Sequence, residues 1–301
     1  MSLISCGWLN VYKPLNITSS NTVSKIKKKF KLKKVGHAGT LDPKAEGILP
    51  IAFGNTTKII SFVTNKSKKY YFIIKWGEQT STDDSEGNLI FKSKKIPNIN
   101  EINSILTKYI GEIYQVPPKY SAIKINGMRA YELSRHKAEF TLLPRKVKIY
   151  SLKYIKNVSA NKSAFSITCG KGFYIRSFAR DFAISLGSRG HIAALKRQEV
   201  GIFKEKNSIL LDDLLKISHL SEGIKGFYHS SVVLDDIPAL TVNNSEKTDI
   251  RMGKKIYISF LNENFFKKLN QKEIICAKNN EELIALGYLQ NGFFKPTKVF
   301  N

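Results

Sequence analysis

The chain has 301 residues, of which 49 are lysine or arginine and 24 are aspartate or glutamate, giving a formal net charge of +25 and an isoelectric point near 9.8. A hydrophobic fraction of 42% and a charged fraction of 24% exclude a disordered chain, and the length is sufficient for a large core with a second, smaller domain. A positive field of this size favours a partner that carries many phosphates.

The first predicted helix covers residues 19–30. Polar residues at 19–21 can cap its start, and apolar residues follow at helical spacing, namely Val23, Ile26 and Phe30. Its other face continues into a run of lysines: Lys25, Lys27, Lys28, Lys29, Lys31, Lys33 and Lys34. This run is either a solvated face or a patch that contacts a nucleic-acid backbone, and its position just before the loop that follows favours the second interpretation.

That loop, residues 36–50, surrounds a single aspartate with glycines and a proline. Its glycines can adopt conformations that are closed to other residues, and Pro43 fixes the backbone directly after Asp42. An Asp-Pro pair alone would indicate only a turn. The whole combination predicts a loop that holds Asp42 in one place.

The middle of the chain alternates irregularly between strands and helices. Aromatic and β-branched residues predict strands at 70–76, 145–156 and 163–169, with a polar turn at 80–87 and a short helix at 100–110. A further helix after the glycines at 170–172 is predicted by apolar spacing and ends at Gly187: Ile175, Phe178, Ala179, Phe182, Ala183 and Leu186. This irregular order favours an α+β fold over a doubly wound α/β fold.

The last third of the chain predicts a change of domain. A helix is expected at about 210–220, and the softer segment 221–231 follows it. Short strands separated by glycines are expected beyond it, at 254–260, 273–278, 283–289 and 293–300. We therefore predict a main domain, residues 1–237, and a small β-rich module, residues 238–301.

The spacing of the cysteines and the lengths of the apolar runs indicate in which cellular compartment the protein is expected. Cys6, Cys169 and Cys276 lie far apart and form no C-x-x-C pair, so they cannot build a disulfide framework or a zinc site by themselves. No apolar run approaches the roughly 18–20 residues that span a bilayer, and residues 1–13 lack the layout of a signal peptide. We expect a cytoplasmic, soluble, monomeric protein without a metal.

Several motifs resemble one known family. Residues 36–49 read G-H-x-G-T-L-D-P-x-A-x-G-x-L, which resembles the signature loop of the TruB family of tRNA pseudouridine synthases. Other segments match this family in order: residues 7–19 (G-x-x-x-x-x-K-P-x-G-x-T-S), 68–70 (K-x-Y), 120–132 (Y-S-A-x-K-x-x-G-x-R-A-Y-E), 169–177 (C-x-K-G-T-Y-I-R) and 190–197 (G-x-x-A-x-L-x-R). Asn16 replaces the usual glycine of the first segment. Because asparagine tolerates a left-handed backbone, we expect that turn to survive.

The resemblance implies a fold and a set of catalytic residues. It implies the pseudouridine synthase catalytic fold, with a mixed or antiparallel sheet and flanking helices, and an RNA-binding PUA-like module at 238–301. In the family the aspartate that matches Asp42 is the nucleophile, and the arginine that matches Arg176 pairs with it and keeps it ionised. Asp84, in the polar turn, resembles a second family carboxylate, and we expect it to be mainly structural.

The resemblance also implies how substrate is held. Tyr70 would stack under the target uracil and serve as the base that takes a proton from the adduct. Tyr174 and Leu195 would line the uracil pocket. His37 would hold nucleotides of the opened RNA loop and is not expected to be catalytic.

The implied reaction converts uridine 55 in the T-loop of tRNA, the TΨC arm, to pseudouridine. Breaking the glycosidic bond, turning the base and rejoining it through carbon needs a nucleophile that forms and releases an adduct, and a carboxylate suits this without any cofactor. The nucleotide must first be flipped out of its stack. The lack of a paired acid and base argues against glycoside hydrolysis, while attack at ribose C1′ or at uracil C6 stays open.

Two alternatives use the same fold. One is a catalytically silent RNA-binding or tRNA-chaperone protein, which the intact Asp42, Tyr70 and Arg176 disfavour. The other is the related eukaryotic and archaeal branch that works within a guide-RNA particle. Its chains carry extra terminal segments that this sequence lacks, so we expect a stand-alone bacterial-type enzyme.

Overall fold

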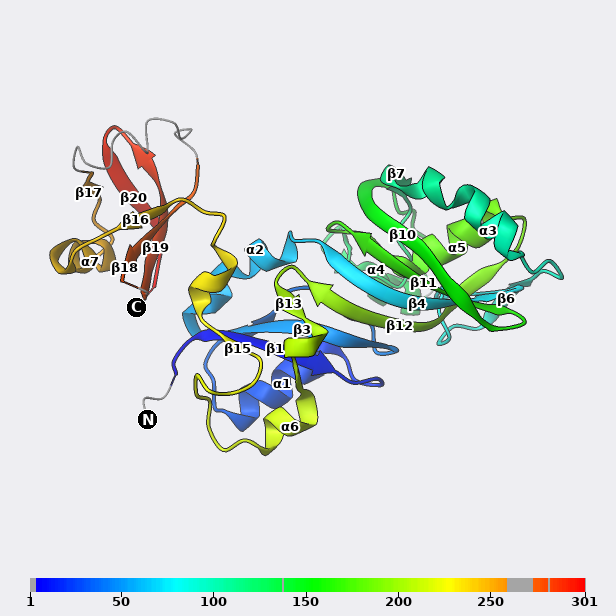
Figure 1. Cartoon of the computed structure of the whole chain (residues 1–301), viewed down its shortest axis with the longest axis horizontal. Helices are drawn as coiled ribbons and strands as arrows, with labels where there is room; N and C mark the ends of the chain where they lie inside the picture. The colour runs from blue at the N-terminus through cyan, green and yellow to red at the C-terminus, as the bar shows by residue number, and fades with distance from the viewer. Residues whose placement is uncertain (1–3, 137, 259–272, 281, 301) are drawn as a thin grey trace.

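The computed structural model describes residues 4–136, 138–258, 273–280 and 282–300, and a large mixed sheet runs through its main body (Figure 1). The strand order is β14 (Ile209–Leu210), β1 (Gly7–Lys13), β3 (Ala45–Phe53), β12 (Gly190–Val200), β4 (Lys68–Trp76), β11 (Lys162–Cys169), β10 (Arg145–Ser159) and β7 (Gly111–Gln115). Three short strands pair with strands of this path: β2 (Val35–His37) with β3, β13 (Phe203–Lys204) with β12, and β15 (Phe227–Tyr228) with β1. β1 and β14 pair in parallel, as do β3 and β12, and the other pairs along this path are antiparallel. The predicted α+β class with a mixed sheet is confirmed.

Helices cover the two ends of this sheet. At one end, α3 (Ile99–Leu106) and α5 (Ile175–Ser185) bury apolar residues against β4, β10 and β11. At the other end, α1 (Ser19–Lys29) and α6 (Leu211–Lys216) pack with β1 and β3. The parallel strands β3 and β12 lie between these two cores (Figure 1). None of the helices in the described ranges is long and apolar enough to cross a membrane.

Short elements connect these layers. Two-stranded sheets are formed by β5 (Glu78–Thr80) with β6 (Leu89–Lys92), and by β8 (Lys124–Ile125) with β9 (Met128–Arg129). Two further short helices are α2 (Ile60–Thr64) and α4 (Ala130–Arg135).

Most of the predicted elements are confirmed within a few residues. The helices at 19–30 and 175–186 are α1 and α5, and the strands at 70–76, 145–156 and 163–169 fall in β4, β10 and β11. The helix at 100–110 is α3 followed by a 3-10 turn, Thr107–Tyr109. The cap of α1 is Thr18, whose hydroxyl accepts from the Asn21 amide, and not a residue of 19–21 as predicted.

Other predictions differ from the structure. The helix expected over 210–220 ends at Lys216, because Ile217 is extended and the chain then returns Leu220 to the core. β3 and β12 were not predicted as strands. In β3, Pro50 and burial on both faces remove the alternation by which a strand is recognised.

The C-terminal residues form a second, small sheet. Its order is β16 (Ala239–Thr241), β18 (Ile275–Asn279), β19 (Glu282–Gln290), β20 (Phe293–Val299) and β17 (Ile256–Tyr257). The predicted strands at 273–278, 283–289 and 293–300 match β18 to β20, while β17 is shorter than 254–260, whose last two residues lie outside the described residues. A helix, α7 (Asn244–Arg251), was missed because Ile250 is its one buried residue among those described. Its capping box, Asn243 with Glu246, is the signal that could have found it.

This sheet packs against the main body. Its residues Cys276, Leu283, Leu286 and Phe300 share one buried cluster with residues of β1, β3 and α2. The Lys58 ammonium donates to the Val299 carbonyl at 2.5 Å and lies 5.6 Å from the centre of the Phe300 ring. The two predicted domains, residues 1–237 and 238–301, therefore share a buried apolar cluster. The boundary between them stays a prediction.

A chain that ends at Ile237 is expected to be less stable than the full chain. Burial of one leucine or phenylalanine side chain contributes about 1.5–3 kcal/mol, and the truncation removes Leu283, Leu286 and Phe300 from the shared cluster. Thermal unfolding should show a lower midpoint, and Phe300→Ala in the full chain should lower it in the same direction. An unchanged midpoint for the truncated main body would contradict this expectation.

Candidate active site

Asp42 lies in the loop between β2 and β3, and the side chain of Arg197 on β12 holds this loop from the interior. Arg197 is 1% exposed. Its guanidinium donates to the carbonyl oxygens of Gly39 at 2.9 Å and Thr40 at 3.3 Å, and its Nε donates to that of Ile48 at 2.7 Å. Three backbone acceptors on both sides of Asp42 are therefore fixed by one buried cation.

A glycine lets β3 and β12 approach each other here. Gly47 pairs with Arg197 in the parallel ladder and has φ +108°. A Cβ at Gly47 would collide with the carbonyl oxygen of Arg197. Glycine is thus required by both the conformation and the close approach of the two backbones.

The N-terminal motif braces the same loop. The Ser19 hydroxyl accepts from the amide of Leu41 at 2.8 Å and donates to its carbonyl at 3.0 Å. Asn16 has φ +63°, and its amide donates to the Pro43 carbonyl at 2.8 Å. The left-handed turn expected at Asn16 is confirmed.

Arg176, in the first turn of α5, holds the Asp42 carboxylate with two contacts. Its Nε lies 2.9 Å from Oδ2 and its Nη2 donates to Oδ1 at 3.1 Å. The Arg176 side chain is 6% exposed, whereas that of Asp42 is 33% exposed. The geometry is a bidentate pair in which the arginine is buried and the carboxylate remains open to a ligand.

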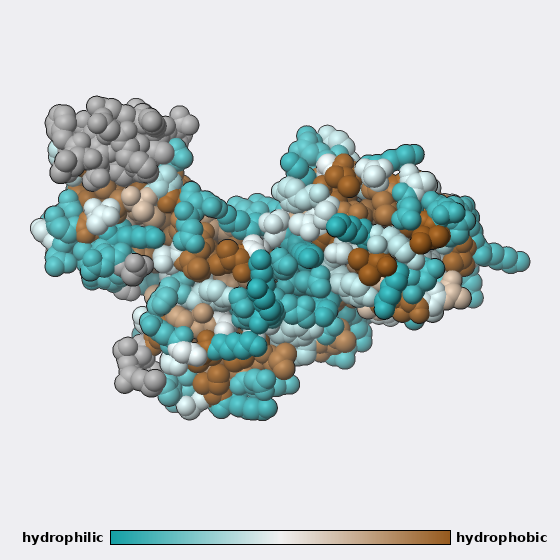
Figure 2. Space-filling model, in the orientation of Figure 1, coloured by the Kyte–Doolittle hydropathy of each residue, from teal (hydrophilic) through white to brown (hydrophobic). Residues whose placement is uncertain are grey.

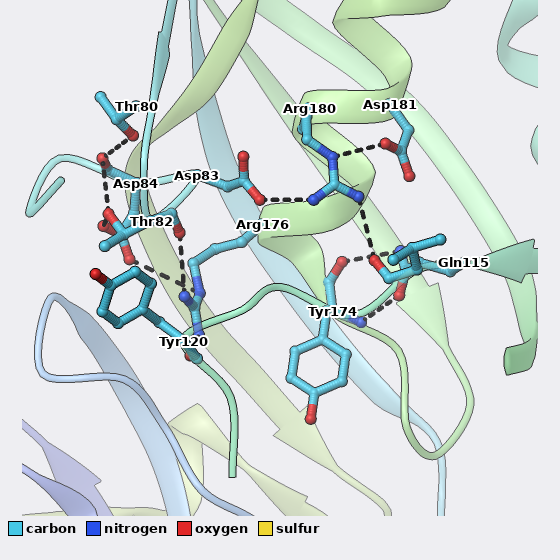
Figure 3. A network of polar contacts seen from close by, with 11 residues as sticks. Thr80, Thr82, Asp83, Asp84, Gln115, Tyr120, Tyr174, Arg176, Arg180 and Asp181 are labelled. Carbon is cyan, nitrogen blue, oxygen red and sulfur yellow. Dashed lines mark hydrogen bonds and ion pairs between the residues drawn. The ribbon is translucent and has the colours of Figure 1, made fainter. Parts of the chain in front are cut away.

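Arg176 also donates to two backbone carbonyls (Figure 3). Nη1 donates to the Thr82 carbonyl at 3.1 Å, and Nη2 donates to the Tyr120 carbonyl at 3.0 Å. The Asp84 carboxylate lies 3.7 Å from Nε and accepts from the Glu86 amide and the Thr82 hydroxyl. Arg176 is therefore held by groups from separate segments, and Asp84 is one of them.

A small pocket opens at this ion pair. It is bounded by the Asp42 loop, the polar turn after β5, the start of α5 and the middle of β12, and its lining residues are Asp42, Lys44, Ala45, Asp84, Ser85, Arg176, Ile192, Ala193, Ala194 and Leu195. Leu195, predicted as a wall of the base pocket, is 9% exposed and lies opposite Ala45 and Phe72 in the sheet. The carboxylate thus faces a recess with an apolar wall.

Tyr70 lies beneath the Asp42 loop on β4. It is 8% exposed, belongs to the same buried cluster as Leu41 and Leu195, and its hydroxyl lies near the Arg197 guanidinium. Burial raises the pKa of Tyr70 above its usual value, and the positive charge of Arg197 opposes this. The phenol is neutral at pH 7, and the charge of Arg197 favours its ionised form.

Tyr174 directly precedes α5, and two hydrogen bonds hold its backbone in place (Figure 3). The Gln115 amide accepts from the Tyr174 N–H at 2.8 Å and donates to its carbonyl at 3.0 Å. Burial raises the pKa of the Tyr174 phenol, while the nearby Ser121 hydroxyl and the charge of Arg176 lower it. Gln115 was missed by sequence reasoning, because nothing in its local pattern indicates a contact with a residue so far along the chain.

His37 ends β2, and its ring lies close to the same arginine. Burial lowers the pKa of His37, and the charge of Arg197 lowers it further. Its Nδ1 is buried and has no hydrogen-bond partner among the residues that the structure describes. The ring is therefore neutral at pH 7 and retains a polar atom for a ligand, which fits a binding role better than an acid–base role.

The predicted residues thus form one site. Asp42, Arg176 and Leu195 line the pocket, Tyr70 packs beneath the loop, and Tyr174 precedes the helix that carries Arg176. In the described part of the chain, no cluster of histidine, cysteine, aspartate and glutamate has the composition of a metal site.

A run of exposed lysines covers the second half of α1 and the segment after it, which reaches β3 at Gly54, the end of the strand away from Asp42. Every lysine of the run after Ser24 is exposed: Lys25, Lys27, Lys28, Lys29, Lys31, Lys33 and Lys34. In the space-filling view, hydrophilic side chains also gather over the middle of the molecule, near β12 and β13 (Figure 2). These surfaces suit a polyanionic ligand.

Comparison with known proteins places these features in a family. Residues 27–175 match the model of the "TruB family pseudouridylate synthase (N terminal domain)". The chain is 40% identical over 298 residues to tRNA pseudouridine synthase B of Ehrlichia ruminantium (strain Gardel), covering 98% of this chain and 99% of that protein. It is also 40% identical over 298 residues to the protein of the same name from Rickettsia bellii (strain OSU 85-389), covering 98% of both.

A solved structure shares the fold. A chain from the crystal structure of a Cbf5-Nop10-Gar1 complex aligns with a TM-score of 0.73 and 23% identity, covering 99% of this chain and 85% of that chain. At this identity the likeness concerns the architecture alone.

Proposed function

Because this chain belongs to the TruB family of pseudouridylate synthases, we propose that it converts uridine 55 in the T-loop of tRNA to pseudouridine, with Asp42 as the nucleophile. The observation that carries the proposal is the bidentate pair between Arg176 and a partly exposed Asp42 at the pocket. The relatives named tRNA pseudouridine synthase B support tRNA as the substrate.

The proposed reaction begins with a flipped uridine. Flipping exposes the glycosidic bond, and the wall formed by Tyr70, Tyr174 and Leu195 replaces the stacking that the base loses. The Asp42 carboxylate then forms a covalent adduct at ribose C1′ or at uracil C6. The glycosidic C1′–N1 bond breaks, the base turns, and a C–C bond forms between C1′ and C5. C5 loses its proton and N1 gains one, so the product is an isomer of uridine, and the adduct releases the carboxylate.

Each neighbouring residue has a proposed part in these steps. Arg176 keeps Asp42 ionised and aimed at the base. Tyr70 takes the C5 proton as a tyrosinate: the phenol, which is neutral at pH 7, first loses its own proton, and the charge of Arg197 favours the ionised form that results. His37 binds nucleotides of the opened loop. We further propose that the protein acts as a monomer in the cytoplasm, with residues 238–301 adding RNA contacts.

A direct assay tests the proposal. The protein would be incubated with an unmodified tRNA transcript, and pseudouridine would be mapped by carbodiimide treatment and primer extension. A stop at uridine 55 supports the proposal. Binding without any conversion would instead favour the silent RNA-binding alternative.

Binding to tRNA is expected to depend steeply on salt. Each neutralised phosphate contributes a slope of about 0.7–0.9 in log K against log salt, and every lysine of the run is exposed. Replacing Lys27, Lys28 and Lys29 with glutamine should flatten this slope without changing which uridine is modified. Filter binding over a salt series measures the effect.

A matched triple variant controls for charge alone. Lys92, Lys94 and Lys108 are exposed at the opposite end of the large sheet, near β6 and α3, and their replacement with glutamine removes the same charge. This control should leave the slope nearly unchanged. If both variants flatten it equally, the run is a solvated face and not a phosphate-contacting patch.

A further inference from the structure

A second arginine of α5, Arg180, stands one turn after Arg176 and makes its own set of contacts (Figure 3). Its Nη1 donates to the Asp83 carboxylate at 2.8 Å, and its Nη2 donates to the Val116 carbonyl at 3.1 Å. Its Nε donates to the neighbouring Asp181 at 2.8 Å. The mechanism proposed above does not use any of these groups.

The Arg180–Asp83 pair is largely buried. The Asp83 side chain is 8% exposed and that of Arg180 is 18% exposed. Burial raises the pKa of Asp83 to about 6, while the charges of Arg180 and Arg176 lower it and that of Asp181 raises it further, so Asp83 is ionised at neutral pH. A carboxylate in this position needs its cation, because an unpaired buried charge is costly.

Asp83 also holds an unusual backbone position. Its φ is +59°, a left-handed conformation that a residue with a side chain seldom adopts, and its carbonyl accepts from the Ile192 amide of β12 at 3.0 Å. The next residue, Asp84, lies beside Arg176. The conformation of Asp83 therefore determines where Asp84 and the Thr82 carbonyl stand relative to Arg176.

The two arginines hold the same two segments. Arg176 contacts the carbonyls of Thr82 and Tyr120, while Arg180 contacts Asp83 and the carbonyl of Val116. Segment 82–84 and segment 116–120 are thus each tied twice to one face of α5. By holding the same two segments, Arg180 keeps in place the carbonyls to which Arg176 donates.

We propose that Arg180 is a positioning residue for the reaction. By binding Asp83 and the Val116 carbonyl, it fixes the two segments that orient Arg176, and through Arg176 it orients the Asp42 carboxylate. This inference rests on the proposed function. Arg180 touches neither Asp42 nor the pocket lining in the described part of the chain, so it acts through Arg176. A displacement of about 1 Å at a reacting group can cost roughly 10²-fold in rate.

The test separates turnover from binding. Arg180→Met should lower kcat on a T-arm stem–loop by about 10–100-fold with KM changed less than about threefold, because RNA binding depends on phosphate contacts elsewhere. Arg180→Lys retains a cation for Asp83 and should recover part of kcat. Asp83→Asn should lower kcat in the same direction, and the double variant Asp83→Asn/Arg180→Met should be no slower than Arg180→Met.

A control variant changes the other carboxylate that pairs with Arg180. Asp181 also pairs with Arg180 but its side chain is 42% exposed and touches neither segment, so Asp181→Asn should leave kcat unchanged. All rates would be measured well below the thermal midpoint of each variant. If Arg180→Met does not fold, Asp83→Asn and Arg180→Lys provide the same comparison.

The outcomes distinguish the two proposals. A kcat for Arg180→Met or Asp83→Asn equal to wild type, or an effect confined to stability or KM, would overturn the positioning role. No pseudouridine from the wild-type protein would instead refute the proposed function, independently of Arg180.

Discussion

Asp42→Asn is expected to abolish pseudouridine formation and leave tRNA binding near the wild-type level. The substitution removes the nucleophilic charge but almost no volume, and loss of a covalent nucleophile costs more than about 10⁴-fold in turnover. Affinity should persist, because phosphate contacts made elsewhere dominate RNA binding. Single-turnover conversion of a tRNA transcript and filter binding measure the two quantities separately.

A control shows that the loop remains intact in this variant. Because Arg197 and Ser19 hold the backbone around Asp42, the asparagine side chain should occupy the same place, and thermal unfolding should change little. Lys216→Gln removes an exposed charge outside the pocket lining and should retain turnover. Detectable conversion by Asp42→Asn would sink the assignment of Asp42 as the nucleophile.

Arg176→Lys is expected to lose most activity, by about 10²–10³-fold, although the charge is kept. The guanidinium contacts both oxygens of Asp42 and the carbonyls of Thr82 and Tyr120 at once. A lysine ammonium is a point charge and cannot reproduce this planar fork. The loss of one preorganised donor in an active site typically costs about this factor.

The readout for Arg176→Lys is kcat on the stem–loop, with binding measured in parallel. Arg251→Lys provides a matched control, because Arg251 contacts Glu282 at 2.6 Å in an exposed carboxylate pair outside the site. Its effect on kcat should be negligible, since exposed pairs contribute little. Near-normal turnover by Arg176→Lys would remove Arg176 from the catalytic group.

Local pattern was sufficient for much of the fold. Apolar spacing predicted α1 and α5, and aromatic and β-branched residues predicted β4 and β11, because each signal lies within one element. The loop predicted over residues 36–50 is confirmed only between β2 and β3, because residues 45–50 belong to β3. β3 was not predicted, because it contains Pro50 and is buried on both faces, so it lacks the alternation of apolar and polar residues that indicates a strand.

The sequence by itself determined which residues carry the proposed chemistry and which family the chain resembles, because its motifs are short and continuous. Only the tertiary structure decided how those residues are held. Gln115 contacts Tyr174 across 59 residues, and Arg197 reaches the Gly39 carbonyl across 158. The burial of Arg180 with Asp83 likewise appears only after α5 and the polar turn pack together. Hydrogen bonds between distant segments depend on the packing of the sheet, which no local spacing encodes.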